Sequence, residues 1–117
     1  MKICKFLSFT SRVAKRPPDF RLEIFESSLP ELTGEASLLD RKEESGEGLV
    51  RNRMLIESDV GSVEAYVYYV DGVARCWCMM NGTGFFEGFY AAGVYWDNPD
   101  GTIYHEGVYQ QKEDRFR

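Results

Sequence analysis

The chain has 117 residues, a formal net charge of −5 and three cysteines. This length fits a single domain over residues 1–117, with a core large enough to fold without a metal or a disulfide. The 15% aromatic content excludes a disordered chain, and no stretch approaches the ~20 apolar residues of a membrane-spanning helix. An odd cysteine count without a signal peptide predicts a cytoplasmic protein in a reducing compartment.

Charge is distributed unevenly along the chain. Residues 1–21 hold six basic groups and one acid, whereas residues 22–64 hold eleven acids and four basic groups. The acidic body disfavours binding to nucleic acid. It is compatible with a basic protein partner, and solubility alone also accounts for it.

The N-terminal segment allows two structures. Residues 2–16 place apolar side chains at helical spacing, but their Phe, Thr and Val content suits a strand equally well. Pro17 and Pro18 end this element, because a residue before proline avoids helical angles. Residues 20–24 alternate between apolar and polar side chains and predict a strand.

A short helix is the next predicted element. Ser28-Leu29-Pro30-Glu31 has the spacing of a capping box, with proline in the first turn. Leu32, Ala36 and Leu39 would then share one face of the helix. An acidic loop over residues 43–48 and a strand over residues 49–57 follow.

Residues 62–80 predict a β-hairpin with Asp71-Gly72 at its tip. A two-residue loop sets Val70 opposite Val73 and fixes the register of the whole hairpin. The expected core face then includes Cys76 and Cys78. The opposite face carries four residues typical of binding surfaces: Tyr66, Tyr68, Arg75 and Trp77.

A second hairpin is predicted to turn at Asn98-Pro99-Asp100-Gly101. Its register sets Tyr95 opposite His105, Trp96 opposite Tyr104, and Gly93 opposite Gly107. Paired glycines are expected to leave a gap on one face of the sheet, which a ring or a backbone can approach closely.

Two Glu-Gly elements, Glu87-Gly88-Phe89-Tyr90 and Glu106-Gly107-Val108-Tyr109, flank this turn. Together with Val94-Tyr95-Trp96 and the turn itself, they resemble a MORN repeat, a β-hairpin unit of approximately 23 residues found in arrays. The resemblance covers about 25 of the 117 residues. Arrays need about three copies to bury a core and no further copy is visible, so the resemblance implies shared hairpin chemistry and no function.

These elements predict an α+β fold that is predominantly antiparallel β. It would consist of a four-strand C-terminal meander over about 63–109, one or two further N-terminal strands and a short helix.

Catalytic and metal-binding groups are sparse. Cys76-Trp77-Cys78 would need two more zinc ligands, and only Cys4 and His105 remain, so we expect no metal. Glu87 and Glu106 form the best carboxylate pair, but nothing in the sequence brings them together. No phosphate-binding loop is present. We therefore expect neither a cofactor nor an enzymatic activity.

The sequence favours a small acidic binding protein that engages another macromolecule, with a protein partner expected and nucleic acid or membrane disfavoured. Its surface would be the acidic loop over residues 43–48 or the face of Tyr66, Tyr68, Arg75 and Trp77, unless another element covers that face. Inhibitors carried by phages or mobile elements, such as immunity or anti-defence proteins, are the class expected. The alternative is a small-ligand site at the glycine gap, lined by Tyr95, Trp96, Tyr104 and His105.

Overall fold

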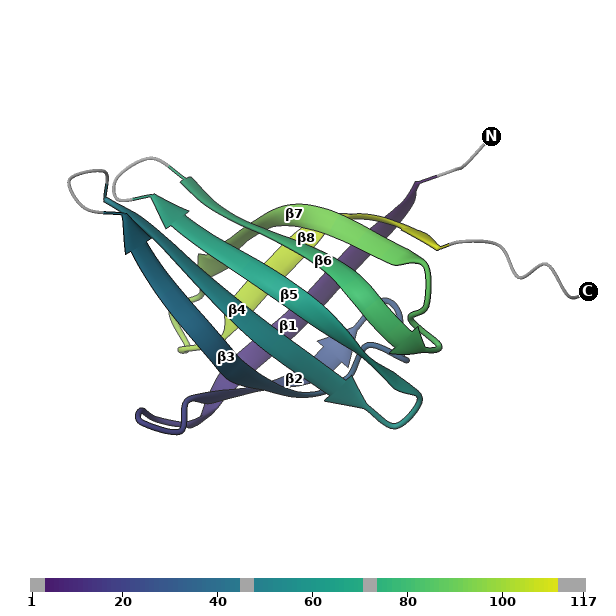
Figure 1. The fold of residues 1–117 in the computed structure, drawn as a ribbon, viewed down its shortest axis with the longest axis horizontal. Helices are drawn as coiled ribbons and strands as arrows, with labels where there is room; N and C mark the ends of the chain where they lie inside the picture. The colour runs from purple at the N-terminus through teal and green to yellow at the C-terminus, as the bar shows by residue number, and fades with distance from the viewer. Residues whose placement is uncertain (1–3, 45–47, 71–73, 112–117) are drawn as a thin grey trace, which may run out of the picture.

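The structure is a computed structural model that describes residues 4–44, 48–70 and 74–111. Eight antiparallel strands follow one another around a closed barrel, and β8 pairs with β1 to complete it (Figure 1). The described ranges contain no helix. The strands are β1 (Lys5–Lys15), β2 (Arg21–Ser27), β3 (Gly34–Glu44), β4 (Leu49–Ser58), β5 (Gly61–Val70), β6 (Ala74–Gly84), β7 (Phe89–Asp97) and β8 (Ile103–Gln111).

The predicted α+β fold is therefore wrong. β5 to β8 do follow one another as antiparallel neighbours, but the sheet continues through four N-terminal strands and closes on itself. Closure pairs Phe6 with Val108 and Phe9 with His105, residues about a hundred positions apart. No local sequence pattern reports a pairing of this kind.

The first element is a strand, which settles the ambiguity of the N-terminal segment. Leu7, Phe9 and Ser11 are buried at alternate positions of β1, while Phe6 points outward and is exposed. This period of two is that of a strand with one face in the core. Strands were also predicted over 20–24 and 49–57, and β2 and β4 confirm both.

The predicted helix near residues 28–39 is replaced by a turn and by β3. Leu29 and Leu32 pack against the core from the turn, where the Leu32 amide donates to the Leu29 carbonyl at 2.8 Å. From Gly34 onward the chain pairs with β2 and β4. The capping pattern is local, and pairing on both sides of β3 overrides it. Of the predicted acidic loop, Glu43 and Glu44 belong to β3, and residues 45–47 lie outside the described ranges.

One end of the barrel is filled by side chains. Leu32 and Phe86 come from the turns at this end, and Leu7, Val63 and Phe89 come from the adjoining strands; all five are fully or almost fully buried. Phe86 packs edge to face on Phe89, with 5.3 Å between ring centroids. At the opposite end of the barrel β1 and β3 end and β2 and β4 begin.

The β5–β6 hairpin has a register one residue away from the predicted one. Val70 pairs with Ala74, not with Val73, and the expected Asp71-Gly72 turn lies outside the described ranges. Because successive side chains of a strand point to opposite faces, this one-residue slip reverses the two faces of β6 relative to β5. Trp77 and Met79 are buried inside the barrel, whereas Cys76 and Cys78 point outward.

The register of the β7–β8 hairpin is confirmed. Tyr95 pairs with His105, Trp96 with Tyr104, and Gly93 with Gly107. At the turn, the backbone N–H of Asn98 donates a hydrogen bond to the Thr102 carbonyl at 2.8 Å, and Gly101 has a φ of 90°. A positive φ of this size favours glycine, as the predicted bulged turn requires.

Candidate binding site inside the barrel

The structure divides both predicted binding clusters between the two sides of the barrel wall. In the first cluster, Tyr66 and Tyr68 point outward on β5, while Trp77 is buried in the interior. Arg75 lies on the same face of β6 as Trp77, two residues closer to the start of the strand. The face that was expected to present four residues to a partner therefore does not exist as a single surface.

The second cluster divides in the same way. Tyr95 and His105 point inward, whereas Trp96 and Tyr104 lie outside with their rings 5.0 Å apart. The structure thus brings together half of each cluster on the inner wall formed by β6, β7 and β8. Those four residues are Arg75, Trp77, Tyr95 and His105.

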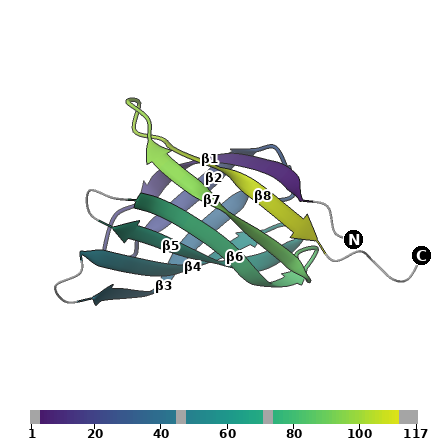
Figure 2. The same ribbon diagram turned by 90° about the horizontal axis from the view of Figure 1, so that it is seen from above.

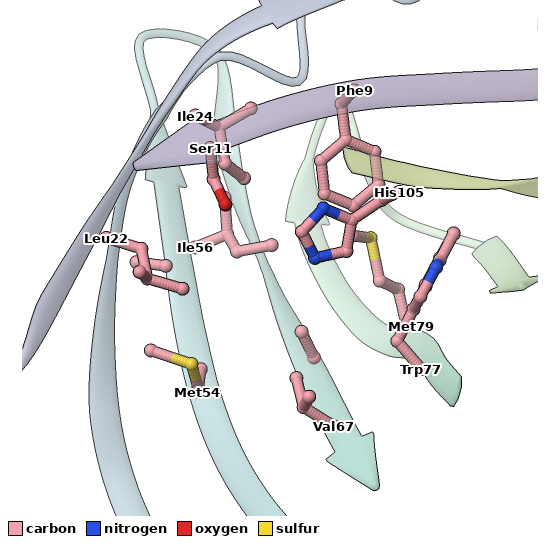
Figure 3. Close-up of a pocket in the computed structure, with 12 residues that line it drawn as sticks. Phe9, Ser11, Leu22, Ile24, Met54, Ile56, Val67, Trp77, Met79 and His105 are labelled. Carbon is pink, nitrogen blue, oxygen red and sulfur yellow. The ribbon is translucent and has the colours of Figure 1, made fainter. Parts of the chain in front are cut away.

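A cavity of about 30 Å³ lies inside the barrel next to this wall (Figure 3). A water molecule needs roughly 10–15 Å³ on this measure, so the cavity has room for about two waters. Its lining is almost wholly apolar and includes the flexible side chains of Met54 and Met79. The complete lining comes from seven strands: Phe9, Ser11, Leu22, Ile24, Ala36, Met54, Ile56, Ala65, Val67, Trp77, Met79 and His105.

Two polar groups interrupt this apolar lining. Ser11 is 1% exposed and His105 is 7% exposed. Neither Ser11 Oγ nor His105 Nδ1 has a hydrogen-bond partner within the described residues. Figure 3 shows both side chains directed into the barrel, from β1 and β8. A buried polar atom without a partner costs about 1–3 kcal/mol of stability, so each of these atoms calls for an explanation.

Aromatic rings hold His105 from both sides. Phe9 stacks on the imidazole with 4.2 Å between centroids, and Tyr95 stacks with 5.6 Å between centroids. Phe9 and Tyr95 are the two residues that pair with His105 across β1 and β7. The imidazole therefore lies between two aromatic rings on the inner wall.

Burial lowers the pKa of His105 to about 4, and hydrogen bonding of the imidazole with the backbone of Phe9 and Ile103 acts in the opposite direction. The imidazole is consequently neutral at pH 7. A neutral imidazole has one donor and one acceptor nitrogen, and Nδ1, which has no hydrogen-bond partner within the described residues, can form a hydrogen bond. No charged side chain lines the cavity, which favours an uncharged occupant.

Charged and phenolic groups lie at the end of the barrel away from Leu32 and Phe86. Arg75 Nη1 lies 2.8 Å from Asp97 Oδ2, and the Arg75 guanidinium lies 5.1 Å from the centroid of the Tyr69 ring. The Tyr95 hydroxyl donates to the Tyr68 carbonyl at 3.3 Å, and burial raises the pKa of Tyr95. This end of the barrel is therefore polar, whereas the cavity is almost wholly apolar.

Ser11 and the two methionines were not predicted as site residues. Ser11 carried a signal that could have found it, because it is the one polar residue in the inward series Leu7, Phe9 and Ser11. That signal is readable only after residues 2–16 are known to form a strand. Met79 was placed on the wrong face by the register error, together with Trp77.

Two general features of metal and membrane proteins were also sought. Within residues 4–44, 48–70 and 74–111, no three His, Cys, Asp or Glu side chains are grouped to hold a metal ion. No helix in the same ranges is long and apolar enough to cross a membrane.

Comparison with known proteins gives no identity. No model of a known protein family matches the chain, and no curated protein matches it. The likeness of residues 85–109 to a MORN unit therefore remains a resemblance of one hairpin, which is now the β7–β8 pair of a barrel.

Proposed function

We propose that this protein is a non-catalytic carrier that binds a small, uncharged, mainly apolar molecule inside the barrel. The observation that carries the proposal is the pair of unpartnered polar atoms, Ser11 Oγ and His105 Nδ1, in an otherwise apolar cavity. A ligand with one hydroxyl group would pair with these atoms and leave its apolar part among Met54, Trp77 and Met79. Eight-stranded barrels have interiors that either fill with side chains or hold one small ligand.

The cavity must expand to admit such a ligand, because ligand pockets usually measure roughly 300–1,000 Å³. Met54 and Met79 line the cavity and are both buried. Methionine is unbranched and adapts its side chain to irregular spaces, so these two residues supply the adjustment. Leu32 and Phe86 fill one end of the barrel. The ligand would therefore enter from the other end, past Arg75 and Tyr95.

Serine and histidine together also raise the question of catalysis. An activated serine needs a hydrogen bond to its base. Ser11 Oγ and His105 Nδ1 both lack partners, so this contact is absent between them. The proposal therefore gives these two residues a role in ligand binding.

Thermal denaturation with phenol, toluene and benzoate tests the proposal. Phenol supplies a ring and one hydroxyl, toluene lacks the hydroxyl, and benzoate carries a charge. We expect phenol to raise the melting temperature most and benzoate to have no effect; a ligand at about 100 times its Kd adds about 2.7 kcal/mol of stability. Isothermal titration then gives the Kd directly.

Matched serine variants provide the control for this experiment. Ser11→Ala removes the inward hydroxyl and should reduce the preference for phenol over toluene. Ser8→Ala removes a serine from the same strand, at a position that pairs with Glu106 outside the cavity, and should bind phenol like the parent. If neither phenol nor toluene stabilises the parent protein, the interior site is refuted.

The expectation of a macromolecular partner, including an inhibitor of the immunity or anti-defence type, remains an untested prediction. The four residues expected to form its binding surface do not share one face, because Tyr66 and Tyr68 lie outside the barrel wall and Trp77 lies inside it. A cytoplasmic location also remains a prediction. All three cysteines are free, which is compatible with a reducing compartment.

A further inference from the structure

Two neighbouring rows of outward side chains across β6, β7, β8 and β1 are poor in charge. Figure 2 views the molecule from the side on which these four strands lie next to one another. Cys78, Ala92, Val108 and Phe6 form one lateral row across them, each paired with the next. The row beside it is formed by Cys76, Val94, Glu106 and Ser8. We call these two rows, together with Tyr90, the outer apolar face.

Large apolar side chains on this face are well exposed. The exposed fraction is 60% for Phe6, 59% for Tyr90, and 47% for both Val94 and Val108. Glu106 is the only charged residue in the two rows, and the Tyr104 hydroxyl donates to its carboxylate at 3.3 Å. A contiguous exposed apolar surface of this kind usually marks an interaction site.

The outer surface of β3, β4 and β5 has the opposite character. Asp40 bridges Arg51 and Arg53 there at 3.1 and 2.8 Å, and Arg53 also lies 3.6 Å from Glu64. The whole chain has a net charge of −5. Two copies that met through charged surfaces would bring like charges together, whereas the outer apolar face lets them meet with little charge on either side.

The outer apolar face carries both a groove and an exposed phenylalanine, Phe6. A groove of about 340 Å³ crosses it, and its lining includes Cys78, Tyr90, Ala92 and Val108. Phe6 is the most exposed large apolar side chain described, and it pairs with Val108 at the edge of the groove. In a two-fold symmetric dimer the same patch serves both partners, so Phe6 of each copy can enter the groove of the other.

Contact at the outer apolar face would be made by side chains. β6, β7, β8 and β1 pair with one another there, whereas the part of β3 beyond Ser37 pairs with β4 alone and lies away from this face. From the low charge of this face, and from the exposed Phe6 and the groove that it carries side by side, we infer that the protein forms a two-fold symmetric homodimer through the outer apolar face. This inference is independent of the interior site.

Sedimentation equilibrium of the parent protein and two matched variants tests the inference. Val108→Glu places a charge in the centre of the face, whereas Val60→Glu changes an equally exposed valine, at 46%, in the turn between β4 and β5. We expect the parent and Val60→Glu to be dimers with a Kd in the micromolar range or below, and Val108→Glu to be a monomer. Circular dichroism checks that both variants remain folded.

Cysteine reactivity identifies the surface that is covered. Cys76 is exposed in the single chain and lies on the outer apolar face. Its alkylation by iodoacetamide should slow as the protein concentration rises through the dimer Kd, and should not slow in Val108→Glu. A parent protein that is monomeric at about 100 µM would overturn the inference. A dimer that Val108→Glu leaves intact, with Cys76 reacting at the monomer rate, would overturn it as well.

Discussion

The rings of Trp77 and Phe9 meet edge to face, with 5.2 Å between their centroids, although two strands separate them in the sheet. Trp77 pairs with Gly93, Gly93 with Gly107, and Gly107 with Leu7, the neighbour of Phe9 on the inner face of β1. No side chain therefore stands between the two rings. The glycine pair does leave room for an aromatic ring, as the sequence predicted, but the protein's own Trp77 and Phe9 use it.

Replacement of Gly93 tests how tightly β7 and β8 approach each other. A Cβ on Gly93 would lie 2.0 Å from the Glu106 carbonyl oxygen and 2.7 Å from the Gly107 Cα. Both atoms belong to the backbone and cannot rotate away, so we expect Gly93→Ala to destabilise the protein by about 3 kcal/mol or more. Urea denaturation measures this loss.

Gly101→Ala is the matched control for that substitution. A Cβ on Gly101 would meet nothing within 4 Å, so only its φ of 90° opposes alanine. The expected cost is about 1–2 kcal/mol. Equal losses in the two variants would contradict the close approach of the strands.

The hairpins show which part of the fold could be read from the sequence. The Asn98-Pro99-Asp100-Gly101 turn contains residues with specific roles. Asp100 Oδ1 accepts a hydrogen bond from the Thr102 backbone amide at 2.9 Å, and Gly101 adopts the positive φ. That turn fixed the register of β7 and β8 correctly. Residues 62–80 offered only Asp71-Gly72, and apolar side chains lie on both faces of β5 and β6, so no polarity contrast distinguished two registers one residue apart.

The closure of the barrel and the interior site were beyond sequence reasoning for a different reason. Ser11 and His105 lie in the first and last strands, and they share a cavity because β8 pairs with β1. Such a contact depends on how every intervening strand pairs. The sequence could identify His105 as a site candidate, but not Ser11, and the single-residue error in β6 put Trp77 on the outside.

Tryptophan fluorescence tests that correction, because the chain has only two tryptophans. Trp77 is 2% exposed, whereas Trp96 is 43% exposed. We expect Trp96→Phe, which leaves Trp77, to emit at shorter wavelength and to resist quenching by acrylamide. Trp77→Phe, which leaves Trp96, should emit at longer wavelength and be quenched readily. The reverse result would restore the predicted register of the β5–β6 hairpin.

Ser11→Ala should leave the ligand-free protein equally stable or stabilise it by about 1 kcal/mol. Ser11 Oγ has no hydrogen-bond partner within the described residues, so the substitution removes a buried polar group without breaking a contact. Ser28→Ala is the control in which a serine hydroxyl with a partner is removed, because Ser28 Oγ accepts a hydrogen bond from the Ser8 backbone amide at 2.9 Å. That variant should lose about 1 kcal/mol in a chemical denaturation experiment. A clear loss of stability in Ser11→Ala would mean that its hydroxyl is already satisfied in the folded protein.

His105 should make stability depend on pH between pH 7 and pH 5. Burial lowers its pKa to about 4 from the 6.5 of an exposed histidine, so the unfolded chain binds a proton in this range and the folded chain does not. Stability must therefore fall as the pH falls, by about 2 kcal/mol from pH 7 to pH 5. His105 is the only histidine, and the carboxyl groups of Asp40 and Asp100, whose pKa values are lowered by hydrogen bonds, titrate below this range. Urea denaturation at each pH should show the slope in the parent protein and a nearly flat profile in His105→Gln, whereas an equal slope in both would place the titrating group elsewhere.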